Sequence, residues 1–204
     1  MRNLSETVAE ANECMDLLES LRESSIAASR VVIRATKRAI HAIHSHEEHD
    51  DLLDGAIAEY DKLYASVCDE PEILFSGPVT DAMMELAEAC ILSSIIRKRD
   101  VPSFSALNIT PQAWVLGLAD CLGEMRRILL DRLMNGDVNE AKDIFEDMEK
   151  VCDHVMSFDV PDAILPVRRK QDIARGVMER TRTDIANALI MKRSNLKFDL
   201  KDRD

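Results

Sequence analysis

Residues 110–134 read TPQAWVLGLADCLGEMRRILLDRLM, and this stretch decides the fold class. Thr110 followed by Pro111 is typical of a helix start, because threonine caps the first amides and proline is tolerated at the first helical position. Asn135-Gly136 follows the stretch and predicts a helix end at Met134. The sequence between these signals is apolar nearly all round. It therefore predicts a helix buried on most of its faces, which needs other helices around it.

Proline-free intervals extend the helical pattern to both sides. The 204 residues include only six glycines and six prolines, and no proline falls in 1–70, 112–160 or 167–204. Proline inside a helix costs about 3 kcal/mol, so these intervals favour helices. We predict one domain, residues 1–204, folded as an all-α bundle of six or seven helices with a long N-terminal helix. The expected helices cover 4–44, 45–64 (from a capping box at Ser45 and Glu48), 79–99, 110–134, 137–155 and 167–191, with connectors at 69–78 and 100–108 and a frayed tail at 197–204.

Composition limits the class of protein. Lys plus Arg number 26 against 38 Asp plus Glu, a net charge of −12, which by itself argues against a nucleic-acid partner. No apolar run approaches the roughly 18 residues of a membrane span, and the charged N-terminus does not resemble a signal peptide. The five cysteines are isolated and form no CxxC, which predicts free thiols in a reducing cytoplasm.

The charge is unevenly distributed along the chain. Residues 24–46 contain no acid, and four cations within them share one helical face, with a histidine extending it. Residues 162–204 hold 11 basic and 7 acidic residues, starting with Arg168-Arg169-Lys170. Such faces can be simply solvated, or they can contact phosphates, which requires clustered cations rather than a basic chain. The candidate nucleic-acid contacts are Arg30, Arg34, Lys37, Arg38, His41, Arg168, Arg169, Lys170 and Arg175.

Two pairs of carboxylates lie inside apolar helical sequence. Glu85 and Glu88 are spaced i, i+3, and Asp120 and Glu124 are spaced i, i+4, so each pair shares a helix face. A buried carboxylate without a partner costs several kcal/mol. A divalent cation such as Mg²⁺ would remove this cost and would also provide hydrolytic chemistry. Alternatively, one acid of each pair faces solvent or caps a neighbouring helix.

Four histidines at a helix end form a second, weaker metal motif. His41, His44, His46 and His49 could bind a transition metal. The acidic run 47–51 and the preference of helical ligand pairs for i, i+4 spacing favour a solvated helix end instead.

Several segments resemble the translin/TRAX family, and more closely its TRAX branch, translin-associated factor X. The most specific is WVLGLADCLGEMRR at 114–127, which resembles the signature helix of the family. The match continues in the same order through most of the chain. Its other segments are SRVVIRATKRAIHAIH at 29–44, ELAEA at 85–89, MNGDVNEAKDIFEDME at 134–149 and LPVRRKQDIARGVMERTRTDIANAL at 165–189.

The resemblance implies a metal-dependent ribonuclease site. The catalytic acids of TRAX match Glu85, Glu88 and Asp120, with Glu124 as the fourth acid, and they would hold one or two Mg²⁺ or Mn²⁺ ions. The family implies binding of single-stranded RNA and DNA inside an octameric shell with a basic inner surface. The connector at 100–108 is shorter than in eukaryotic relatives, which implies a compact prokaryotic or archaeal type that forms a homo-oligomer.

The sequence thus predicts a cytoplasmic endoribonuclease that cleaves single-stranded RNA, with single-stranded DNA as a second ligand. Three alternatives stay open: a translin-type binding protein without catalysis, a carboxylate di-iron bundle, and a scaffold without a ligand. The di-iron bundle requires Glu-x-x-His pairs, and the sequence contains none.

Overall fold

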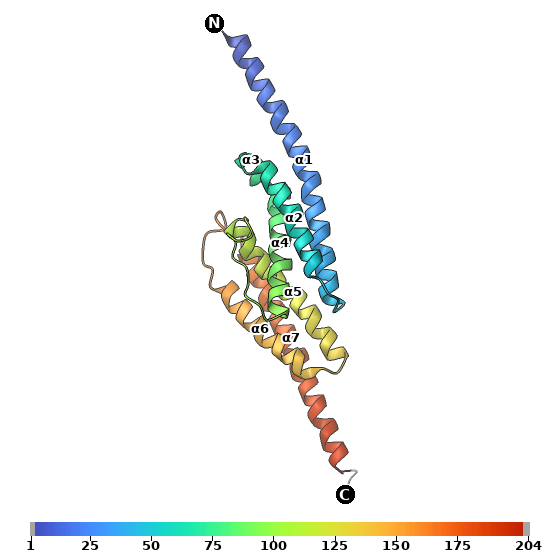
Figure 1. Cartoon of the computed structure of the whole chain (residues 1–204). Helices are drawn as coiled ribbons and strands as arrows, with labels where there is room; N and C mark the ends of the chain where they lie inside the picture. The colour runs from blue at the N-terminus through green and yellow to red at the C-terminus, as the bar shows by residue number, and fades with distance from the viewer. Residues whose placement is uncertain (1–2, 202–204) are drawn as a thin grey trace. The chain divides into compact units, whose positions relative to one another are not determined.

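The computed structural model of the chain describes residues 3–201, with side chains described to residue 192. In this range every regular element is a helix, which confirms the all-α prediction (Figure 1). The chain forms two compact units, Met1–Ala89 with Ser103–Ala113, and Cys90–Pro102 with Trp114–Asp204. The seven helices of the described range are α1 (Leu4–His44), α2 (Asp50–Val67), α3 (Pro71–Leu74), α4 (Gly77–Ile96), α5 (Pro111–Met134), α6 (Val138–Met156) and α7 (Arg168–Lys201).

In the first unit, α1 packs along α2 (Figure 1). The buried face of α1 carries small side chains, including Ser25, Ser29 and Ala35, which allow close approach of the neighbouring backbone. On α2, the Tyr60 hydroxyl donates to the carbonyl of Asn108 at 2.8 Å, and burial raises the pKa of Tyr60. This bond ties the loop before α5 to the α2 helix.

The first half of α1 lies outside this packing. Between residues 4 and 24, only Leu18 and Leu21 are even half-buried, and all other side chains are exposed. Apolar side chains at Leu4, Val8 and Met15 therefore remain in solvent.

The second unit contains the end of α4 with α5, α6 and α7. Apolar residues at a spacing of three to four along α6 are buried, namely Val138, Ala141, Phe145, Met148, Val151 and Val155, and α6 packs on α7. Cys152, beside Val151, is only half-buried. None of the five cysteines is in a disulfide bond; Cys90 and Cys121 are buried, Cys68 and Cys152 are half-buried, and Cys14 is exposed.

Left-handed residues end three helices and explain one wrong prediction. His46, Lys98 and Gly136 have positive φ angles, of 57°, 54° and 85°. At the end of α1, the amides of His46 and Glu47 bond back to the carbonyls of Ile43 and Ala42. The predicted capping box at Ser45 and Glu48 therefore does not form, because these residues close α1, and α2 begins only at Asp50.

Helix α1 has the predicted bounds, 4–44, and most of the other helix boundaries lie within three residues of the prediction. Helix α4 covers 77–96 rather than 79–99, and the predicted connector 69–78 contains the short α3. The start of α5 is confirmed by the bond from the Ala113 amide to Thr110 Oγ1 at 3.1 Å. Helix α7 continues to residue 201, so the predicted frayed tail is wrong for 197–201, and 202–204 lie outside the described residues. No described helix is long and apolar enough to cross a lipid bilayer.

Candidate nucleic-acid and metal-binding residues

The acidic pair of the first unit lies on α4. Glu85 and Glu88 are both half-buried and flank the fully buried Leu86 and Ala87. The apolar side chains around them lower the effective dielectric constant, which strengthens any interaction of these carboxylates with a cation. The predicted partial burial of this pair is thus confirmed.

The acidic pair of the second unit lies on α5, and each of its carboxylates has a cationic neighbour. The side chains of Asp120 and Glu124 are 32% and 30% exposed. Lys170, in the first turn of α7, donates from Nζ to both carboxylate oxygens of Asp120, with 2.7 Å between Nζ and Oδ2. Arg127 Nη1 lies 4.0 Å from Glu124 Oε2. The partner that the sequence required for Asp120 is therefore a lysine of α7, which sequence spacing could not reveal.

The donor chemistry of these residues fits a hard divalent cation. All four supply carboxylate oxygens from half-buried positions, and Asp120 already holds a cationic group. Within residues 3–192, no three His, Cys, Asp or Glu side chains form a ready-made metal cluster. The four histidines of the predicted transition-metal motif form no such cluster either. His49 is buried, and its Nδ1 lies 3.1 Å from the carbonyl oxygen of Glu47.

The basic residues of α1 form an exposed face. Arg30, Arg34, Lys37, Arg38 and His41 are exposed, opposite the buried side of the same helix. Among the described residues none of these side chains has an ion pair or hydrogen-bond partner. Unpaired cations on one face can contact successive phosphates without first breaking a salt bridge. We call these five residues the α1 basic face.

The basic residues of α7 are largely compensated by acids. Arg168 Nε lies 3.5 Å from Asp162, Arg175 Nη1 lies 2.6 Å from Asp172, and Lys170 pairs with Asp120. Arg169 is exposed and has no ion-pair partner among the described residues. The predicted second cationic stripe is therefore less available than the α1 basic face.

Sequence reasoning missed Arg126, which joins α5 to α7. Its guanidinium donates to Thr181 Oγ1 at 2.7 Å and to Asp184 Oδ2 at 2.8 Å. An arginine inside an otherwise apolar helix was the available signal, because such a residue needs an acceptor.

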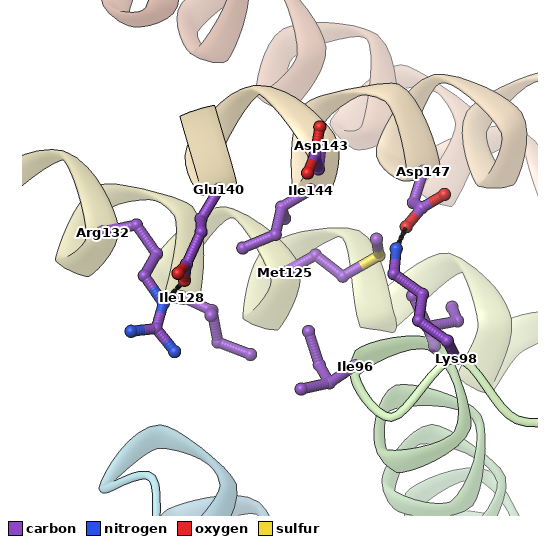
Figure 2. Close-up of a pocket in the computed structure, with 10 residues that line it drawn as sticks. Ile96, Lys98, Met125, Ile128, Arg132, Glu140, Asp143, Ile144 and Asp147 are labelled. Carbon is purple, nitrogen blue, oxygen red and sulfur yellow. Dashed lines mark hydrogen bonds and ion pairs between the residues drawn. The ribbon is translucent and has the colours of Figure 1, made fainter. Parts of the chain in front are cut away.

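The second unit also contains a cavity of about 160 Å³ (Figure 2). Met125, Ile128 and Ile144 form apolar walls, and two ion pairs, Lys98–Asp147 and Arg132–Glu140, stand at its sides. Burial alone would raise the pKa of Asp147, but hydrogen bonds from Lys98 and Lys150 outweigh it and hold that pKa below its usual value. Four of the charged side chains that line the cavity therefore form two ion pairs, and the fifth, Asp143, has none among the described residues.

The fold of the chain is similar to those of several solved structures. The fold matches the crystal structure of AfC3PO with a TM-score of 0.83 and 33% identity, covering 91% of this chain and 98% of that chain. A complex of AfC3PO with duplex RNA matches with the same TM-score and 32% identity, covering 91% and 97%. Apo-NeC3PO shares the fold, with a TM-score of 0.76 and 18% identity over 92% of this chain and 98% of that one. The helical fold is thus that of a C3PO-type chain.

The chain belongs to the translin family, as these likenesses show. It is also 35% identical over 170 residues to MJ0175, an uncharacterised protein of Methanocaldococcus jannaschii, covering 82% of this chain and 76% of that protein. No established family model matches the chain.

Proposed function

We propose that this chain is a metal-dependent endoribonuclease of the TRAX type that acts on RNA within a homo-oligomer. The observation that carries the proposal is the half-burial of all four acids at the positions that the resemblance marks as catalytic, Glu85, Glu88, Asp120 and Glu124. When bound, Mg²⁺ or Mn²⁺ would supply an activated water and offset the charge of the phosphodiester. The carboxylates of this chain would hold the cation.

The α1 basic face would hold the RNA backbone. Its cations are exposed and unpaired among the described residues, so they are available to phosphates. The complex of AfC3PO with duplex RNA supports RNA as the ligand class. Because the sequence predicts single-stranded RNA, with single-stranded DNA as a second ligand, the test should compare single strands with duplexes.

The cleavage assay uses labelled single-stranded RNA, duplex RNA and single-stranded DNA, with Mn²⁺ and with EDTA. We expect cleavage of single-stranded RNA only when metal is present. Asp120→Asn and Glu88→Gln should each lower the rate at least about 100-fold, because each removes a charged oxygen donor while keeping the side-chain shape. Asp81→Asn, an exposed acid on α4, is the matched control and should cleave as wild type does. Equal rates for all variants would refute the assignment of the acids.

A second candidate, a binding protein without catalysis, is favoured by one observation. Asp120 already forms an ion pair with Lys170. This candidate predicts salt-sensitive RNA binding with an unchanged affinity in EDTA and no cleavage with Mn²⁺. The same assay distinguishes the two functions.

A further inference from the structure

The ion pair between Lys170 and Asp120 joins two residues that were predicted to have different roles. Asp120 is a proposed metal ligand, and Lys170 was predicted to contact nucleic acid. The Lys170 ammonium donates to both carboxylate oxygens, and the two side chains are 28% and 32% exposed. An ammonium group in this position uses the same oxygen lone pairs that a metal ion would need.

The start of α7 is fixed by other contacts, so this ion pair is not needed to hold the helix in place. Next to Lys170, the buried Gln171 donates from Nε2 to the carbonyls of Val155 and Phe158, at 3.0 and 2.9 Å. Further along, Arg126 of α5 bonds to Thr181 and Asp184 of α7. The lysine can therefore leave Asp120 without undocking α7 from α5 and α6.

The position of Lys170 in the first turn of α7 is electrostatically unfavourable for the helix. It lies in the first turn of α7, beside Arg168 and Arg169, and this turn contains no acid. Cations at the positive end of a helix dipole are unfavourable, and clustering them adds mutual repulsion. The carboxylate of Asp120 offsets this cost only while the pair is intact.

We propose that Lys170 is a positioning residue of the metal site, a tethered cation that holds Asp120 in the metal-free protein and is displaced when a divalent ion binds. This inference rests on the proposed function, since it takes Asp120 as a metal ligand. Lys170 would then lower the apparent metal affinity, because each metal ion must compete with its ammonium group.

Calorimetric titration of the full chain with Mn²⁺, without RNA, tests this competition. Lys170→Met should bind Mn²⁺ about tenfold more tightly than wild type, because the charge-assisted bond no longer has to break. Lys170→Arg keeps the competing charge and should bind as wild type does. Arg182→Met is the charge-matched control: it removes a cation from the same helix, one paired with Glu149 at 3.0 Å, and should leave the affinity unchanged.

The possible results separate this inference from the proposed function. Metal binding that depends on Asp120, with equal affinity in wild type and Lys170→Met, overturns only the role of Lys170. Weaker binding by Lys170→Met overturns it too, since the lysine would then assist the metal. If wild type and Asp120→Asn show the same titration with no binding, both the metal site and the role of Lys170 are refuted.

A second measurement follows the wild-type lysine itself and needs a Lys170 variant only to assign its signal. Lysines are reductively methylated with ¹³C, which keeps their positive charge, and Lys170→Arg identifies the Lys170 signal. Addition of diamagnetic Mg²⁺ should shift this signal, whereas that of Lys62, paired with Glu59 at 2.7 Å, should not move. A Lys170 signal that stays in place at saturating Mg²⁺ contradicts the proposal.

Discussion

Asp147 shows how single residues set the electrostatics of the second unit. It accepts hydrogen bonds from Lys98 and from Lys150, the latter at 2.9 Å, and these bonds hold its pKa below the usual value against the opposing effect of burial. Lys98 is itself the left-handed residue that follows α4, with a φ of 54°. The ionised form of Asp147 is therefore the form that the fold stabilises.

Asp147→Asn should lower the unfolding temperature at pH 7 by about 1–3 °C, since partly exposed ion pairs contribute about 0.5–1 kcal/mol. The pKa of Asp147 is lower in the folded protein than in the unfolded chain, so its ionised carboxylate stabilises the fold at a pH above the unfolded-state pKa. This stabilisation is lost as the pH falls through the pKa of the folded state. The difference from wild type should therefore shrink below about pH 4.

Thermal unfolding followed by circular dichroism between pH 7 and 3 checks this. Asp143→Asn is the control on the same helix, because Asp143 is exposed and has no ion pair in the described residues. It should stay within about 1 °C of wild type at each pH. A constant difference for Asp147→Asn at every pH would contradict the mechanism.

At the same scale, the sequence predicted which acids are half-buried but not their partners. The apolar context of Glu85 and Asp120 follows from local sequence, because helical spacing is a local property. The partner of Asp120 is 50 residues away on α7. That contact depends on how α5 and α7 pack, which periodicity does not encode.

At the scale of elements, some helix ends could be predicted from the sequence and others could not. The end of α5 at Asn135-Gly136 was predictable because glycine readily adopts the left-handed conformation. The end of α1 at residue 44 is also as predicted, although His46 takes that conformation against its ordinary preference. Helix α4 ends at residue 96 rather than 99, because Lys98 takes the same conformation there. Hydrogen bonds of the following residues back into each helix stabilise these turns.

Gly136→Ala should destabilise the protein by about 1 kcal/mol, lowering the unfolding temperature by about 2–4 °C. No atom lies within 4 Å of an added Cβ, so the cost is conformational, from the φ of +85°. Gly55→Ala is the matched control: it is also uncrowded, but it lies inside α2 and is exposed. It should raise the stability by up to about 1 kcal/mol. Changes of the same sign in both variants would contradict this account.

The α1 basic face is the element-scale feature that bears on RNA. Arg34→Ala combined with Lys37→Ala should weaken RNA binding and lower the salt slope by about 0.7 for each lost phosphate contact. Stability should stay unchanged, because both side chains are exposed and unpaired among the described residues. Fluorescence anisotropy with labelled RNA at several salt concentrations measures both quantities.

The charge-matched control for the Arg34→Ala and Lys37→Ala double variant is Lys62→Ala combined with Lys142→Ala. These exposed lysines lie on α2 and α6 and pair with Glu59 and Glu146. They should leave the salt slope unchanged. Equal losses in both double variants would mean that net charge, rather than the α1 basic face, governs binding.

At the scale of the whole molecule, the exposed half of α1 indicates self-association. The helix has 41 residues and is about 60 Å long. Most of the stability of a helix in a protein comes from packing of its apolar face, yet residues 4–24 make almost no contact that buries a side chain. Leu4, Val8, Ala11, Met15 and Leu18 line one side of this half, in the spacing of a helix that packs against another helix. The proposed homo-oligomer, expected to be an octamer, would cover this stripe.

Val8→Asp combined with Met15→Asp should therefore reduce the oligomer to smaller species, because two buried charges would disfavour packing of the stripe. Leu17→Asp is the matched control: Leu17 is 66% exposed but lies about 140° around the helix from the centre of the stripe. It should keep the wild-type mass. Light scattering coupled to size-exclusion chromatography gives the mass of each variant. If Leu17→Asp dissociates the assembly and the double variant does not, the opposite side of α1 is the contact; if neither does, residues 4–24 do not form the interface.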